Sequence, residues 1–268
     1  MGKELQKLRA RKEVRKRLDA IDSRRDMCLV IHYSCESFYD IKDGRTPRVT
    51  SIAIREFESG QTTSFSIHKN AELKGVPLAD ITAKYDELEK EMLAEFYAYL
   101  KTKPDHSFIH WNMRDINYGF QAIEHRYRVL KGEPVSVADG KKIDLARELV
   151  ALFGVKYAPH GGSGRLHSLM EMNDITAKDA LTGAGEAEAF ERQEYVKLHQ
   201  STLRKVDVVA NLLDRVLDGS LKTKATWGDQ HGFHPVAVIE WINEHWLYAG
   251  LTIVALLLGF YVTFKDMI

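Results

Sequence analysis

The chain has 268 residues and a formal net charge of zero. Hydrophobic residues make up 44% of it and charged residues 28%, and both fractions are ordinary for a globular protein. Its two cysteines, Cys28 and Cys35, are seven residues apart on one expected strand, so we expect free thiols rather than a disulfide. The neutral total hides an asymmetry, because residues 1–26 carry ten Lys or Arg and five Asp or Glu. This segment therefore has a net charge of +5, and the remainder has −5.

The N-terminal segment is predicted to be a basic helix. Apolar residues recur at intervals of three or four through residues 3–25, as one face of a helix requires. Its basic face could contact anionic lipid or nucleic acid, or it could be the solvated side of a helix that packs on its own domain or on a partner. The charged N-terminus has no secretory signal pattern, so we expect the body of the protein to stay cytosolic.

The next segments alternate between strand and helix patterns. A strand is predicted at 28–34, a hairpin at 49–57 and 62–68, an amphipathic helix at 79–101, a short strand at 106–110, and a helix at 115–130. Further helices are predicted at 143–153, 166–172 and 186–217, with a glycine-rich break at 161–164. The order predicts an α/β fold with a mixed sheet flanked by helices. It is also the order of the ribonuclease-H-like fold.

The C-terminal segment 246–264 has nineteen residues without a charge or a proline. A helix of this length spans about 28 Å, which nearly matches a hydrocarbon core of about 30 Å. Aromatic residues lie at both of its ends, as interfacial anchors do. We therefore expect a single-pass C-terminal transmembrane anchor with the N-terminal domain in the cytosol; a buried core helix or an oligomerisation helix is the alternative.

Two clusters of polar residues lie where strands end. The first strand continues into Ser34-Cys35-Glu36, and the fourth strand continues into His110-Trp111-Asn112-Met113-Arg114-Asp115. Farther along, Asp144 precedes a Leu-Ala-Arg helix, and His199 precedes Arg204, Lys205 and Asp207 on a long helix.

In this order the chain resembles the DEDD family of 3′–5′ exonucleases. That resemblance implies carboxylates at Glu36, Asp115 and Asp207 that bind two Mg²⁺ or Mn²⁺ ions, with His199 as general base. Ser34 stands where the family has Asp, and Arg204 stands at the family's spacing for the last Asp. A hydroxyl is a poorer ligand than a carboxylate, and an arginine would repel a dication.

The resemblance covers residues 27–217 and leaves three functions open. The first is a membrane-anchored, metal-dependent exonuclease or phosphodiesterase that acts on nucleic-acid 3′ ends or small nucleotides. The second is an inactive nuclease-like module that binds a nucleotide or nucleic acid through Asn112, Arg114, Arg204 and Lys205 and signals to an oligomerising membrane helix, as in antiviral-defence effectors. The third is a membrane scaffold. One helix cannot form a pore, so the second function requires a homo-oligomer or a partner membrane protein.

The expected domain organisation follows these segments. We expect residues 1–26 to form the basic helix, 27–220 the exonuclease-like domain, 221–245 a linker and juxtamembrane helix, and 246–264 the transmembrane helix.

Overall fold

The structure is a computed structural model that describes residues 2–37, 46–176 and 178–226, and beyond them residues 228, 240, 250, 251 and 253–258. The predicted membrane-spanning segment 246–264 therefore lies mostly outside the described residues. Among the described residues, no helix has both the length and the apolar character needed to cross a membrane. The membrane anchor stays a prediction from the sequence.

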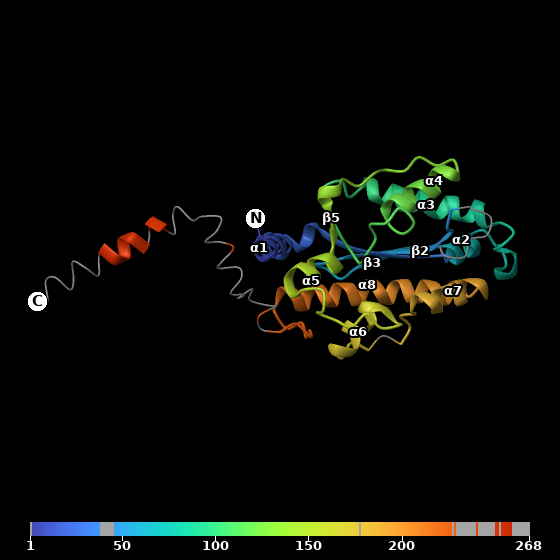
Figure 1. Cartoon of the computed structure of the whole chain (residues 1–268). Coiled ribbons are helices and arrows are strands. Elements are labelled where there is room, and N and C mark those ends of the chain that lie inside the picture. Colours follow the sequence, from blue (N-terminus) through green and yellow to red (C-terminus); the bar gives the residue numbers. More distant parts are fainter. Residues whose placement is uncertain are drawn as a thin grey trace, which may run out of the picture.

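A five-stranded mixed sheet forms the centre of the fold (Figure 1). Its order is β3-β2-β1-β4-β5, with strands β1 (Cys28–Cys35), β2 (Val49–Glu56), β3 (Thr62–Ser66), β4 (Ser107–His110) and β5 (Lys142–Asp144). β1 pairs antiparallel with β2 and parallel with β4, and β4 pairs parallel with β5. The carboxyl ends of β1, β4 and β5 therefore lie at the same edge of the sheet.

Helices cover both faces of the sheet. They are α1 (Lys3–Ser23), α2 (Ile67–Leu73), α3 (Tyr85–Lys101), α4 (Phe120–Val129), α5 (Leu145–Phe153), α6 (Gly164–Met172), α7 (Gly183–Glu191) and α8 (Tyr195–Leu217). Figure 1 shows α3 and α4 on one side of the sheet and α8 on the other. The predicted α/β fold with a mixed sheet flanked by helices is confirmed, and its layout fits the ribonuclease-H-like order.

Alternation along β1 determines which side chains face α8. Leu29, Ile31 and Tyr33 belong to the hydrophobic cluster that contains α3 and α4. Successive side chains on a strand point to opposite faces, so His32 and Ser34 face α8. Both are buried, at 5% and 1% exposure. Polar side chains are therefore buried between β1 and α8, near the carboxyl end of β1.

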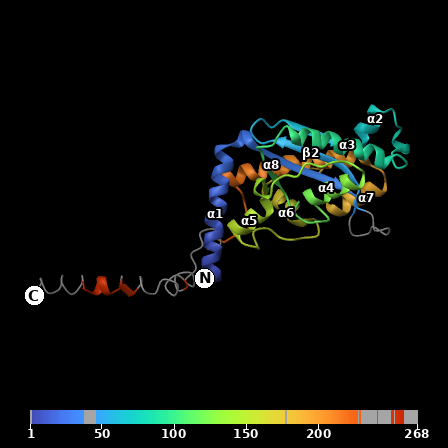
Figure 2. The ribbon, with the colours of Figure 1, turned by 90° about the horizontal axis from the view of Figure 1, so that it is seen from above.

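Helix α1 packs as part of the core. Its apolar residues Val14, Leu18 and Ile21 join the cluster formed by α5, α6 and α8. Arg17 pairs with Glu148 of α5 at 2.8 Å. Figure 2 shows α1 lying across one end of the body beside α5. Of the two alternatives for this helix, packing on its own domain accounts for its apolar face.

Several segments differ from the sequence prediction. The helix predicted at 79–101 begins at Tyr85. The helix predicted from Asp115 begins at Phe120, because residues 114–119 form a tight loop that closes through an antiparallel bridge between Arg114 and Gly119. A Cβ atom at Gly119 would lie 2.5 Å from the Met113 carbonyl oxygen, so this close approach requires glycine. α2 and β5 were not predicted, and the helix predicted at 186–217 is interrupted before Tyr195.

Candidate functional site

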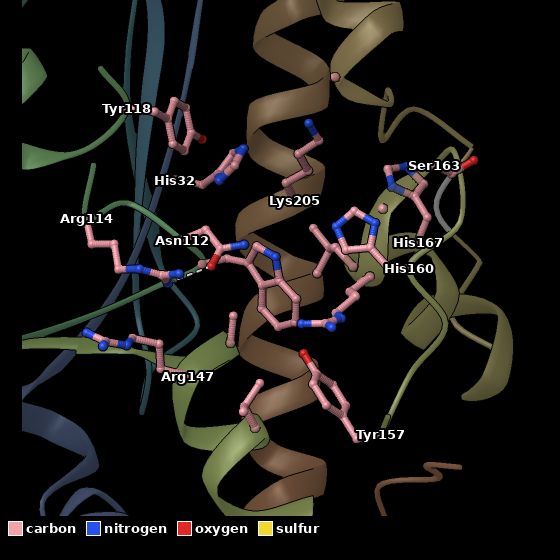
Figure 3. A pocket seen from close by; sticks show the side chains of 17 residues that line it. His32, Asn112, Arg114, Tyr118, Arg147, Tyr157, His160, Ser163, His167 and Lys205 are labelled. Atoms are coloured by element: carbon pink, nitrogen blue, oxygen red, sulfur yellow. Dashed lines mark hydrogen bonds between the residues drawn. The ribbon is translucent and has the colours of Figure 1, made fainter. Parts of the chain in front are cut away.

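A cavity of about 440 Å³ lies beside the carboxyl ends of the parallel strands (Figure 3). Residues that follow β4 and β5 form one wall, and Lys205 from the middle of α8 lines its floor. The segment before α6 and the first turn of α6 form the opposite wall. Open α/β sheets bind ligands at this edge, and the volume is in the usual range for a small-molecule site.

The lining is cationic and aromatic. Among the described residues it contains three arginines, one lysine, three histidines, three aromatic rings and no Asp or Glu; the lining residues with polar or aromatic side chains are His32, Trp111, Asn112, Arg114, Tyr118, Arg147, Tyr157, His160, Ser163, Arg165, His167 and Lys205. A second cavity of about 320 Å³ shares Arg114 and Arg147 with the first. The lining of the first cavity attracts anions and offers aromatic rings for stacking.

The loop after β4 is held in place by Asp144. The Asp144 carboxylate accepts hydrogen bonds from the backbone N–H groups of Asn112 and Ala146, each at 3.1 Å. The bond from Ala146 caps the N-terminus of α5. Arg114 forms an ion pair with the same carboxylate and donates to the Asn112 side chain at 2.8 Å. Asn112 has φ of 56°, which asparagine tolerates. These contacts orient Asn112 and Arg114 toward the cavity.

Hydroxyl groups and an ammonium surround Glu186 where β1 meets α8. One oxygen of Glu186 accepts from Ser34 at 2.9 Å and from Ser201 at 2.8 Å, and it lies 2.7 Å from the ammonium of Lys205. Thr202 donates to Ser34 at 2.8 Å. The carboxylate offsets the buried charge of Lys205 and holds its side chain at the cavity floor.

Two buried polar groups at the cavity lack a partner in the described part of the chain. Neither ring nitrogen of His32 makes a hydrogen bond, and the hydroxyl of Tyr157, a residue with no exposure, makes none. Burial, and then the charge of Lys205, lower the pKa of His32 well below its ordinary value, while burial raises that of Tyr157 to about 12. Both groups are therefore neutral and able to bond a ligand.

No family model, curated protein or solved structure matches this chain. The chemistry of the cavity is therefore the basis for assigning a function.

The structure places the predicted metal ligands apart from this cavity. Glu36 lies beside Arg48, whose backbone amide donates to its carboxylate at 3.3 Å, in a separate hollow. Asp115 is exposed in the loop before α4, where it accepts from the Asn117 amide at 2.8 Å. Asp207 pairs with Arg55 of β2 at 3.1 Å.

The remaining predicted residues divide between the cavity and other surroundings. Asn112, Arg114 and Lys205 line the cavity, and their role in binding stays a prediction. Arg204 is exposed on α8 and is not part of the lining. His199 packs against His68, with 5.1 Å between the ring centroids.

The described lining of this cavity does not offer the oxygen donors that Mg²⁺ or Mn²⁺ prefers. These cations require several oxygen ligands, usually carboxylates. Among the described residues, no group of three or more His, Cys, Asp or Glu side chains is close enough to hold a metal. Beside Ser34 and Glu186, the ammonium of Lys205 would repel a dication.

Several lining residues could not be identified from the sequence. His32 lies within an apolar strand pattern, and Tyr157, His160 and Arg165 surround a glycine-rich segment that resembles an ordinary flexible break. The alternation of β1 does place His32 on the same face as Ser34, which is the one local signal available. The other side chains are brought to the cavity by the packing of α6.

His199 gives a testable pH dependence. Burial, followed by the nearby His68 and Lys69, lowers the pKa of His199 from 6.5 to about 4. Its neutral form is favoured in the folded state, so its contribution is present above pH 6.5 and is lost as the pH falls toward 4. Between pH 7 and pH 5, we expect protonation of His199 in the unfolded state to lower the free energy of unfolding by about 2 kcal/mol. Urea unfolding at both pH values should therefore show a smaller difference for His199→Gln than for the unmodified protein.

The exposed His125 on α4 supplies the control for this measurement. His125→Gln should retain the full pH dependence. An equal pH dependence in His199→Gln and the unmodified protein would contradict a buried neutral His199.

Proposed function

We propose that this protein is a binding module for a phosphorylated ligand, either a nucleotide or a nucleic-acid end, and that it binds without metal-dependent cleavage. The observation that carries this proposal is the cavity at the sheet edge, whose lining combines four cations and three aromatic rings and, in the part of the chain that the structure describes, includes no carboxylate. Phosphate groups favour cations, and nucleobases stack on aromatic rings. The lining offers both kinds of contact.

The distribution of charge supports an anionic ligand. Arg114 and Lys205 are offset by Asp144 and Glu186, respectively. Arg147 and Arg165 have no carboxylate partner in the described part of the chain, so the cavity keeps an excess of positive charge. A site built for a metal would require the opposite sign.

The resemblance to DEDD exonucleases fits this proposal if the fold has been kept and the metal chemistry lost. The order of strands and helices supports a ribonuclease-H-like fold. Ser34 and Arg204 stand where the family has Asp, and the ammonium of Lys205 lies beside Ser34 and Glu186, where it would repel a dication. The proposed module would recognise the kind of ligand that the family recognises.

The predicted C-terminal membrane helix at 246–264 completes the proposed architecture. In this architecture a cytosolic body binds the ligand and a single helix crosses the membrane. Ligand binding can affect the membrane only if this helix associates with another helix. We therefore include a homo-oligomer or a partner membrane protein in the proposal, with an antiviral-defence effector as the architectural analogue.

Cleavage and binding can be measured on the same sample of the full chain in detergent. We expect 3′-labelled single-stranded DNA and RNA to remain intact with Mg²⁺ or Mn²⁺. Fluorescence polarisation should show that labelled oligonucleotide or nucleotide binds equally well in EDTA, because the cavity binds phosphate through side-chain cations. Glu36→Ala should bind as tightly as the unmodified protein.

Two outcomes would contradict the proposal. Degradation that depends on Mn²⁺ and disappears in Glu36→Ala would establish a nuclease. A folded protein that binds neither nucleotides nor oligonucleotides would favour the scaffold.

A further inference from the structure

The N-terminal end of α6 opens directly at the cavity. Ser163, Gly164 and Arg165 all line it, and α6 begins at Gly164. Gly164 has φ of 81°, a backbone conformation that favours glycine, so the chain can turn into the helix at the cavity wall. Ser163 makes no side-chain capping bond, and the first turn has no acidic residue. The Gly164 amide donates to the Gly161 carbonyl oxygen at 2.9 Å. The next N–H groups of the first turn lack intrahelical partners and carry partial positive charge.

Tyr157 provides an independent sign of a ligand at the same place. Its ring lies beside the first turn of α6, with the guanidinium carbon of Arg165 5.6 Å from the ring centroid. The side chain is fully buried, yet its hydroxyl has no partner in the described part of the chain. Figure 3 shows this hydroxyl directed into the cavity. A buried hydroxyl without a hydrogen bond is unfavourable, and a bound oxygen would satisfy it.

Arg165 adds a charge to this group of donors. One terminal nitrogen donates to the Val155 carbonyl oxygen at 3.1 Å, while the Nε atom is buried without a partner in the described residues. A helix N-terminus, a phenol and a guanidinium converge here on one end of the cavity. Several donors around one point suit the oxygens of a phosphate.

We propose that the N-terminal end of α6, Tyr157 and Arg165 form the phosphate subsite of the cavity. This inference rests on the proposed function. Figure 3 shows His32 and Tyr118 at the opposite end of the cavity from Tyr157. The sugar and base of a nucleotide would extend toward that end, where the unpartnered ring nitrogens of His32 can bond the base.

The test compares a nucleoside 5′-monophosphate with the matching nucleoside, using the full chain and isothermal titration calorimetry. We expect the unmodified protein to bind the monophosphate more tightly. Tyr157→Phe should reduce this preference about tenfold and leave nucleoside affinity unchanged, because it removes one donor to a charged group. Arg165→Gln should reduce it as well. Tyr99→Phe, on α3 and outside the lining, is the control.

Thermal unfolding gives a second readout that a purely structural role would not produce. Tyr157→Phe removes an unpaired buried hydroxyl, so the free protein should unfold at the same or a higher temperature. Inorganic phosphate should raise the unfolding temperature of the unmodified protein and have a smaller effect on Tyr157→Phe.

The outcomes separate this inference from the proposed function. If Tyr157→Phe and the unmodified protein prefer the monophosphate equally, the phosphate lies elsewhere and this subsite is wrong, while the binding function stands. If the unmodified protein binds neither compound and no oligonucleotide, the proposed function itself fails.

Discussion

Arg126→Met is expected to destabilise the protein by about 3–5 kcal/mol, as removal of one partner from a buried ion pair does. Arg126 of α4 is 3% exposed, and its guanidinium lies 2.5 Å from a carboxylate oxygen of Glu89, which has no exposure. Glu89 of α3 also accepts from the Val49 amide of β2 at 2.6 Å. The pair therefore connects two helices and a strand, and its loss would leave a carboxylate buried without its cation. Burial already raises the pKa of Glu89.

Urea unfolding at neutral pH measures this effect. Arg128→Met is the matched control, because Arg128 is on the same helix and its side chain is 55% exposed, with a 3.4 Å contact to Glu124. Its loss should cost less than about 1 kcal/mol. The double variant Glu89→Gln with Arg126→Met should regain part of the lost stability, because no buried charge remains unpaired. A change below 1 kcal/mol in Arg126→Met would contradict this role for the pair.

Local patterns predicted the elements that have a clear period or a turn signal. The hairpin of β2 and β3 and the amphipathic face of α3 are of this kind. β5 was missed because its three residues run directly into α5, so that Ile143 resembles the first apolar position of a helix. α2 was missed because it follows β3 without an intervening turn. Both depend on tertiary pairing and packing rather than on local sequence.

The geometry of α8 explains why motif spacing located part of the site. A helix turns about 100° per residue, so Ser201 and Lys205, four residues apart, share one face. Asp207 is two residues beyond Lys205 and is rotated by about 200°, which directs it toward Arg55 instead of the cavity. The order of motifs pointed to α8, whose Lys205 lines the cavity. Deciding which face of it meets β1 required the packed structure.

Among the substitutions at the cavity, we expect Lys205→Ala to have the largest effect on nucleotide binding. The Lys205 side chain is 7% exposed, lines the cavity and lies 2.7 Å from Glu186. An ammonium has three donors, and the contact with Glu186 uses one of them. Loss of a charge-assisted bond to phosphate costs about ten- to a hundredfold in affinity, so we expect Lys205→Ala to lower nucleotide affinity by this factor. Arg204→Ala removes the neighbouring exposed cation and should change affinity little.

The double variant Lys205→Ala with Glu186→Gln separates binding from folding. Lys205→Ala alone leaves the largely buried Glu186 carboxylate without its cation, which should lower stability as well as affinity. Glu186→Gln removes that charge and can retain the bonds from Ser34 and Ser201. We expect the double variant to regain stability in urea unfolding and still to bind nucleotide weakly. If it binds as tightly as the unmodified protein, Lys205 serves only to offset Glu186, and the cavity floor makes no contact with the ligand.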